Sequence, residues 1–230
     1  MPFPFWFRRT TEYFDCAQFD KVVESVGVTL AEKNRYSMRS RVGTKAFTDT
    51  KNRTIRFDKK WFLNLSPRAR CAVLVHEVWH IATLKDKMRA RNRFLLYVFP
   101  GLLAFSFGFV VVVYAATFFL IGRGVFLPGL PILLYPIMLV FGMPYGFRRW
   151  SWPIEYASDE AGVRCIGADA TREVIRSLKL NTDITTHPPT RLRLANVDSV
   201  AAKYPIPLID LNSLERTAKQ EFVFKPVRQK

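Results

Sequence analysis

The apolar residues divide this chain into two polar parts separated by a long apolar middle. Residues 94–122 contain no charged side chain, and after Arg123 a second uncharged run covers residues 124–147. Each run exceeds the roughly 20 apolar residues that a membrane-spanning helix needs. The pattern therefore predicts a transmembrane hairpin over residues 94–147. A buried core hairpin is the alternative, but a chain of 230 residues offers little protein to cover two such helices.

The polar parts carry the patterns of both strands and helices. Two extended segments rich in β-formers are predicted over residues 44–49 and 52–58, with a polar turn between them. Ser66 followed by Pro67 marks a helix start, because Ser is a favoured N-cap and Pro fits the first helical position. The apolar periodicity carries this helix to Arg93. Further helices are predicted over residues 19–28, 151–165, 170–180 and 190–204.

The charge balance is strongly basic, with 35 Lys and Arg against 19 Asp and Glu and a formal net charge of +16. Such a chain suits a polyanionic partner, either nucleic acid or anionic lipid. No zinc-finger spacing or RNA-recognition signature is present, so anionic membrane lipids are the expected partner and nucleic acid is not. The basic residues gather at both ends of the apolar middle: Lys85, Lys87, Arg89, Arg91, Arg93, Arg148 and Arg149.

Basic flanks on both sides of a hairpin predict that the polar parts are cytoplasmic. The expected location is therefore the plasma or inner membrane, in a multi-pass arrangement. The three scattered cysteines, Cys16, Cys71 and Cys165, form no disulfide framework, which agrees with a reducing compartment. The sequence does not indicate an oligomeric state.

The predicted helix that begins at Ser66 carries the sequence His76-Glu77-Val-Trp-His80. Histidines four residues apart lie on one face of a helix, so both imidazoles can reach one metal ion. The glutamate between them suits a general base that takes a proton from the attacking water. The five-residue pattern also occurs by chance in ordinary helices. A chance match is less expected here, because the chain holds only three histidines and two of them form this pair.

A third ligand candidate lies on the helix that follows the apolar middle. Glu155 and Asp159 are four residues apart and share one helical face. Two histidines and one glutamate leave a coordination position open, which is the arrangement of catalytic zinc sites. Asp159 is placed to accept a hydrogen bond from a ligand histidine and fix its orientation. The hairpin is then an insertion in one domain.

Three segments together resemble the HtpX and CAAX-prenyl-protease family of membrane zinc metallopeptidases, which are gluzincins. They are residues 76–80, residues 155–162 with the sequence Glu-Tyr-Ala-Ser-Asp-Glu-Ala-Gly, and residues 186–190 with the sequence Thr-His-Pro-Pro-Thr, followed by Arg193. This family also places apolar spans between the first two segments. The resemblance covers about residues 40 to 200.

The resemblance implies a Zn²⁺ cofactor held by His76, His80 and Glu155. It implies Glu77 as base and proton shuttle, and Asp159 as the partner that orients a ligand histidine. Zinc then supplies the Lewis acid that peptide hydrolysis needs.

Two other residues, His187 and Arg193, match positions that polarise the substrate carbonyl or stabilise the oxyanion, where a donor or cation is needed. The segment Lys45-Ala46-Phe47 aligns with the Asn-Ala-Phe segment of the family, at an edge strand that binds peptides by strand addition. Ala46 and Phe47 are therefore expected to bind substrate. Lys45 and the bulky Trp79 depart from the residues that are common in the family.

The expected fold is α+β, a gluzincin-like domain with a small mixed sheet and active-site helices, interrupted by the transmembrane hairpin. Residues 1–93 and 148–204 form the catalytic domain, and residues 205–230 form a charged tail. The expected function is a membrane-anchored endopeptidase that cleaves unfolded or membrane-associated polypeptides. The alternatives are a processing protease for one precursor or prenylated substrate, and a non-catalytic zinc scaffold. Retention of Glu77 argues against the scaffold.

Overall fold

The structure is a computed structural model of the whole chain. It describes residues 11–39, 45–83, 92, 99–121, 151–178, 187–217 and 220–225. The chain divides into two compact units. The first contains residues 1–84, 154–182 and 189–230, and the second contains residues 85–153 and 183–188.

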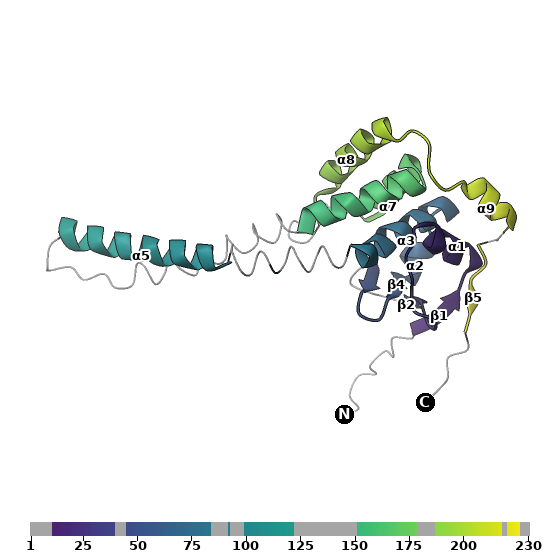
Figure 1. Cartoon of the computed structure of the whole chain (residues 1–230), viewed down its shortest axis with the longest axis horizontal. Coiled ribbons are helices and arrows are strands. Elements are labelled where there is room, and N and C mark those ends of the chain that lie inside the picture. The colour runs from purple at the N-terminus through teal and green to yellow at the C-terminus, as the bar shows by residue number, and fades with distance from the viewer. Residues whose placement is uncertain are drawn as a thin grey trace, which may run out of the picture. The chain divides into compact units, whose positions relative to one another are not determined.

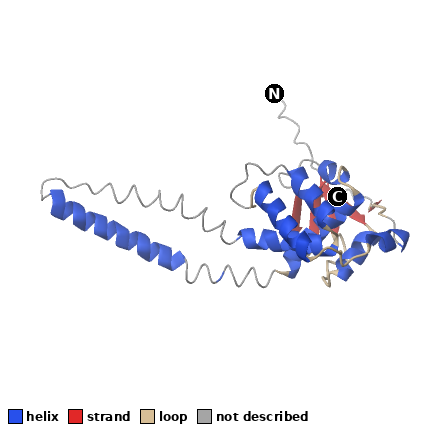
Figure 2. Ribbon diagram, turned by 90° about the horizontal axis from the view of Figure 1, so that it is seen from above, coloured by secondary structure: helices blue, strands red, loops and turns tan. Residues whose placement is uncertain are grey.

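The first unit is built on a five-stranded mixed sheet with the strand order β3-β4-β2-β1-β5. Strands β2 and β4 pair in parallel, whereas the other neighbours are antiparallel. β3 lies at one edge of the sheet and β5 at the other. Figure 1 labels β4, β2, β1 and β5, and Figure 2 shows the strands in red. The strands are β1 (Thr11–Asp15), β2 (Tyr36–Arg39), β3 (Ala46–Asp49), β4 (Thr54–Asp58) and β5 (Val223–Phe224).

Helices of the first unit stack above this sheet in the view of Figure 1, with α3, then α7, then α8 at increasing distance from it. Residues 151–165 are also helical and contain Glu155 and Asp159. The predicted combination of helices with a small mixed sheet is therefore confirmed. The labelled helices of this unit are α1 (Ala17–Ser25), α2 (Lys59–Leu63), α3 (Pro67–Ala82), α7 (Ala168–Leu178), α8 (Thr190–Lys203) and α9 (Leu211–Thr217).

The core forms where alternate strand residues point to the helices, as the two-residue repeat of a strand requires. The buried strand side chains are Phe14, Tyr36, Met38, Ile55 and Phe57. Many of the core side chains are aromatic. The rings of Phe57 and Phe62 stack with centroids 4.1 Å apart, and Phe14 stacks on Tyr36 at 5.6 Å. This cluster fixes the sheet against the helix that carries the two histidines.

Helix α3 begins where the sequence predicts. The Ser66 hydroxyl accepts a hydrogen bond from the Ala69 amide, and Pro67 occupies the first turn. Glu173 of α7 accepts hydrogen bonds from the Ser66 amide at 2.8 Å and the Ser66 hydroxyl at 2.6 Å. The helix ends at Ala82 and is therefore shorter than predicted, and residues 84–91 lie outside the described residues.

The C-terminal segment, which the sequence predicts only as a charged tail, contributes apolar side chains to the core. Ile209 and Leu211 are buried, and Phe222 meets Phe14 edge-on with ring centroids 5.2 Å apart. β5 then pairs with β1 and extends the sheet. These apolar residues are spaced among charges without a helical or strand period, so the pattern alone does not reveal that they complete the core.

In the second unit the first apolar run forms helix α5 (Phe99–Ile121). Among the described residues, no helix combines the length and the apolar character needed to cross a membrane. The predicted transmembrane hairpin is therefore not confirmed. Its second arm, residues 124–147, and the basic residues at both flanks lie outside the described residues.

Candidate metal centre

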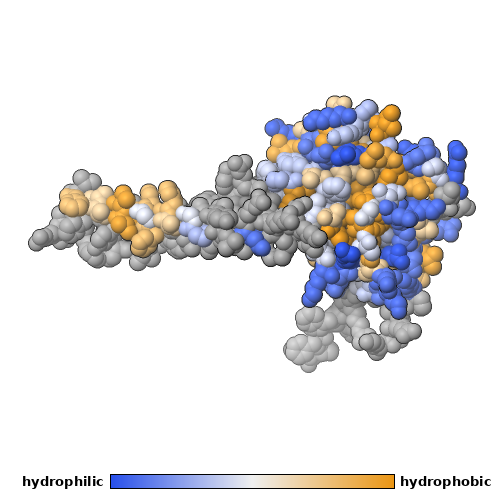
Figure 3. Space-filling view, in the orientation of Figure 1, coloured by the Kyte–Doolittle hydropathy of each residue, from blue (hydrophilic) through white to orange (hydrophobic). Residues whose placement is uncertain are grey.

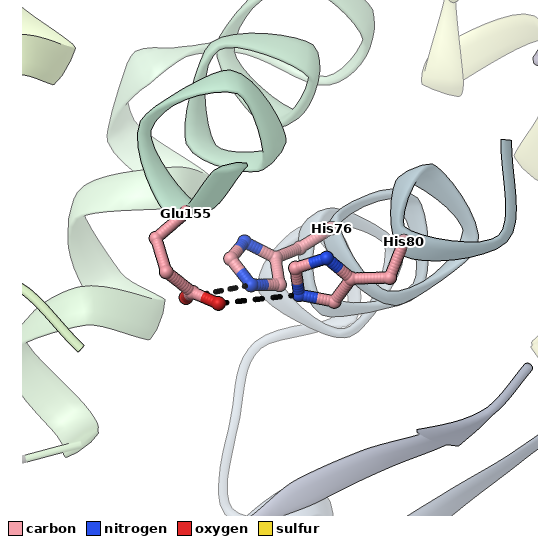
Figure 4. A group of neighbouring side chains, drawn as sticks. All are labelled: His76, His80 and Glu155. Atoms are coloured by element: carbon pink, nitrogen blue, oxygen red, sulfur yellow. Dashed lines mark ion pairs between the residues drawn. The ribbon is translucent and has the colours of Figure 1, made fainter. Parts of the chain in front are cut away.

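Three predicted ligands come together from two helices of the first unit. His76 and His80 project from one face of α3, and Glu155 reaches them from the helix over residues 151–165 (Figure 4). Nε2 of His76 lies 3.5 Å from Oε2 of Glu155, and Nε2 of His80 lies 3.5 Å from Oε1. The ligand atoms of all three residues lie within 4.8 Å of one another.

This spacing fits a zinc ion. Zinc binds imidazole nitrogen and carboxylate oxygen at about 2.0–2.2 Å, so two ligand atoms in a tetrahedral site stand about 3.4 Å apart. Both distances from Glu155 to the histidines match that value. In the part of the chain that the structure describes, no other group of three or more His, Cys, Asp or Glu residues is placed to hold a metal.

The charge around His76 also favours a cation. Burial disfavours the protonated form of this imidazole, but hydrogen bonds and charge interactions with Asp159 and Glu155 outweigh burial and raise the pKa of His76 to about 10. The two carboxylates thus stabilise positive charge between His76 and Glu155. A divalent cation bound at Nε2 would supply that charge in place of a proton.

Asp159 joins His76 to a buried arginine. Its Oδ1 lies 3.1 Å from Nδ1 of His76, within hydrogen-bond distance, and its role in orienting a metal ligand stays a prediction. Arg193 of α8 donates from Nε to Oδ2 at 2.7 Å and from Nη2 to Oδ1 at 2.6 Å. Burial opposes the ionised form of Asp159, but the hydrogen bonds and charges of Arg193 and His76 lower its pKa. A paired charge of this kind is stable in a buried position.

The structure places Arg193 differently from the expectation that it contacts the substrate. Its side chain is 2% exposed and its guanidinium is bound to Asp159, behind His76. The geometry supports a positioning role through Asp159, and a direct contact with the oxyanion stays a prediction. The hydrophobic periodicity of α8 does not distinguish an arginine that points inward from one on the solvated face.

A buried serine missed by the sequence reasoning orients the other histidine. Ser158 is 0% exposed, and its Oγ lies 3.2 Å from Nδ1 of His80. The same hydroxyl donates to the backbone carbonyl of Ile154 at 2.9 Å, so it accepts from Nδ1–H of His80. Nε2 of His80 then carries the lone pair that a metal needs. The available signal was its position three residues after Glu155, on the same helical face.

Glu77 lies between the metal ligands and the edge of the sheet. Its side chain is buried, and its Oε2 lies 2.5 Å from the hydroxyl of Thr48 on β3. The predicted substrate residues Ala46 and Phe47 lie on this same edge strand. Ala46 is partly buried, whereas Phe47 is 48% exposed. Their contacts with a substrate stay a prediction.

The remaining predicted residue, His187, lies in a bend that precedes α8 and is half-buried. It belongs to the second compact unit, whereas the metal ligands belong to the first. Its role at the oxyanion therefore stays a prediction.

A helix that carries both histidines and a glutamate, a second helix that supplies a carboxylate, and a small mixed sheet beside them characterise a metallopeptidase. The comparison with protein-family models agrees with this class. Residues 16–201 match the model of Peptidase family M48, and the chain belongs to this family. The resemblance that the motifs indicate is thus confirmed. No curated protein and no solved structure gave a significant match.

Proposed function

We propose that this chain is a zinc-dependent endopeptidase, with His76, His80 and Glu155 as the zinc ligands. The observation that carries the proposal is the match between the His–His–Glu spacing and a tetrahedral zinc site. Zinc bound there would polarise the scissile carbonyl and lower the pKa of a water molecule to about 7.

The side chains of the chain have the following proposed roles. Glu77 takes a proton from the attacking water and later returns it to the leaving amine. Asp159 and Ser158 hold the two imidazoles with Nε2 directed to the metal position. Arg193 keeps Asp159 ionised and in place. The family resemblance alone supports His187 as a donor to the oxyanion.

Edge strand β3 supports the proposal that the substrate is an extended polypeptide. A peptide added to this edge forms main-chain hydrogen bonds, which do not depend on its sequence, while pockets for alternate side chains set any preference. Ala46 and Phe47 form part of this edge. Broad cleavage of unfolded or membrane-associated polypeptides is therefore the favoured reading, and processing of one precursor or prenylated protein is the alternative.

Membrane anchoring through residues 94–147, with the catalytic unit cytoplasmic, is a further part of the proposal. The two uncharged runs support it, and so do the exposed apolar side chains on α5, which include Phe105, Phe107 and Phe119 (Figure 3). The chain is expected to stay in the membrane fraction after an alkaline carbonate wash. Release into the supernatant would contradict the anchoring and leave the peptidase proposal intact.

Cleavage of casein by the detergent-purified protein tests the enzyme itself. We expect wild type to cleave, and both the Glu77→Gln variant and the chelated wild type to lose cleavage by at least about 100-fold. The variant should still bind one zinc ion per chain, because Glu77 is not a ligand. Cleavage that persists in Glu77→Gln excludes the proposed base. An inactive wild type with a full zinc content favours either a processing protease with a narrow substrate range or the non-catalytic scaffold.

A further inference from the structure

A single side chain connects the edge of the sheet to the base. The hydroxyl oxygen of Thr48 lies 2.5 Å from Oε2 of Glu77 and 3.0 Å from the backbone carbonyl oxygen of the same residue. Thr48 belongs to β3, and Glu77 lies inside α3 next to the ligand His76. This contact therefore joins the proposed substrate strand to the proposed catalytic helix.

The hydroxyl has one proton, which can be donated to only one of these acceptors. The backbone carbonyl of Glu77 lies inside the regular span of α3, where the amide four residues later serves it. The carboxylate is both the closer acceptor and the charged one, and charge-assisted hydrogen bonds are the stronger kind. The proton of Thr48 is thus assigned to Oε2 of Glu77.

We propose that Thr48 is a positioning residue that holds the carboxylate of Glu77 in its working orientation. It also ties that orientation to the strand on which the substrate main chain binds. The inference rests on the proposed peptidase function and adds a residue to it. A bound peptide and the carboxylate of Glu77 would then both contact β3. The hydrogen bond from Thr48 to Glu77 would set the position of the base relative to the peptide.

Threonine suits this position for two reasons. Thr48 pairs with Ile55, whose side chain is fully buried on the helix side of the sheet, and it therefore faces α3. Its neighbour Phe47 is about half exposed. The β-branched side chain of Thr48 has few χ1 choices, so the hydroxyl is held in one direction. A misplacement of about 1 Å in a catalytic group can cost about 100-fold in rate.

The test compares Thr48→Val and Thr48→Ser in the full-length, detergent-purified protein. Valine keeps the shape and removes the hydroxyl, whereas serine keeps the hydroxyl. Thr54→Val on the neighbouring strand β4 is the matched control, because it makes the same chemical change away from the base. Each variant is assayed for zinc content, Tm, and kcat and KM on fluorescently labelled β-casein.

Thr48→Val is expected to lower kcat about 10- to 100-fold and to change KM less than about twofold, because the hydroxyl contacts Glu77 and not the substrate. Thr48→Ser should recover kcat to within about threefold of wild type, and Thr54→Val should match wild type. Zinc content should be equal in all four proteins.

Three results would overturn the inference while the peptidase proposal stands. They are a wild-type kcat in Thr48→Val, no recovery in Thr48→Ser, or a loss of kcat that follows a loss of zinc or of Tm. If the wild-type protein with its zinc bound does not cleave, the proposed function fails, and this inference fails with it.

Discussion

At the scale of single residues, we expect the stability of the fold to be most sensitive to substitutions in the pair Asp159–Arg193, because both charges are buried. Asp159→Asn leaves the Arg193 guanidinium without its counter-charge at 1–2% exposure. Breaking a buried pair in this way costs about 3–5 kcal/mol. We expect a loss of that size in urea unfolding of the metal-free protein. Asp198→Asn, which alters an exposed pair with Arg172, should change stability by less than about 1 kcal/mol.

The pH dependence of the same pair has a defined sign. Arg193 and His76 lower the pKa of Asp159 in the folded chain, so the folded state binds this proton less tightly than the unfolded state does. The stabilisation is complete above the unfolded value of about 3.9 and is lost as the pH falls through the folded pKa. His76, whose pKa Asp159 helps to raise, contributes fully only below its unfolded value of about 6.5. The stability difference between wild type and Asp159→Asn should therefore be largest and nearly constant from about pH 5 to 6, and it should shrink at lower pH. A difference that grows as the pH falls below about 5 contradicts this assignment.

Ser158→Ala tests the second buried partner of a ligand. It removes the acceptor for Nδ1–H of His80, and loss of such a partner typically weakens metal binding about 10- to 100-fold. Competition with a fluorescent zinc chelator measures the change. Ser25→Ala is a matched control, because its hydroxyl also bonds the carbonyl four residues earlier in a helix but lies far from the site in sequence and is exposed. Equal zinc affinity in both variants would exclude an orienting role for Ser158.

Sequence reasoning at this scale is strongest where helical spacing decides the outcome. The ligands His76, His80 and Glu155 could be chosen because four-residue spacing places side chains on one face, and the structure brings them together. Ser158 and Thr48 were not identified as partners, because their contacts depend on how two elements face each other. The spacing of residues within one helix or strand does not indicate how that element faces another.

At the scale of elements, the N-terminus of α3 is fixed by Ser66. Its hydroxyl caps Ala69 and also donates to Glu173, so one side chain joins the start of α3 to α7. Ser66→Ala should lower the stability by about 1–2 kcal/mol and Tm by roughly 2–8 °C, as measured by circular dichroism. Because the metal ligands lie at the other end of α3, zinc affinity should be unchanged. A large loss of zinc affinity would contradict this separation.

The sequence predicts most helices and two strands of the first unit, but not the pairing of the strands or the short strand β5. The strands at 44–49 and 52–58 and the helices after residue 150 appear close to the expected positions. The sequence does not indicate that β2 pairs in parallel with β4. Side-chain alternation identifies a strand, whereas its pairing partner depends on the path of the chain. β5 was missed because a two-residue strand is too short to show any period.

At the scale of the whole molecule, the apolar segment is inserted into the first unit at points that lie close in sequence to two of the proposed metal ligands. His80 lies four residues before the end of the first stretch of that unit, and Glu155 lies next to the start of the second stretch. Replacement of residues 85–153 by a flexible linker of about ten residues, which spans roughly 17 Å, should therefore leave a folded unit. We expect it to be extracted without detergent and to bind one zinc ion. A linker variant that aggregates or binds no zinc would show that the segment supports the fold.

The separation of the ligands along the chain also has a consequence for the timing of synthesis. His80 leaves the ribosome about 75 residues before Glu155, which at 5–20 residues per second is a delay of roughly 4–15 s. During that interval the nascent chain holds two ligands and a base but no third ligand. The complete His–His–Glu site can assemble only after the whole apolar segment has been translated. If the three residues hold zinc as proposed, an unfinished chain lacks a complete metal site and gains peptidase activity only once Glu155 has been made.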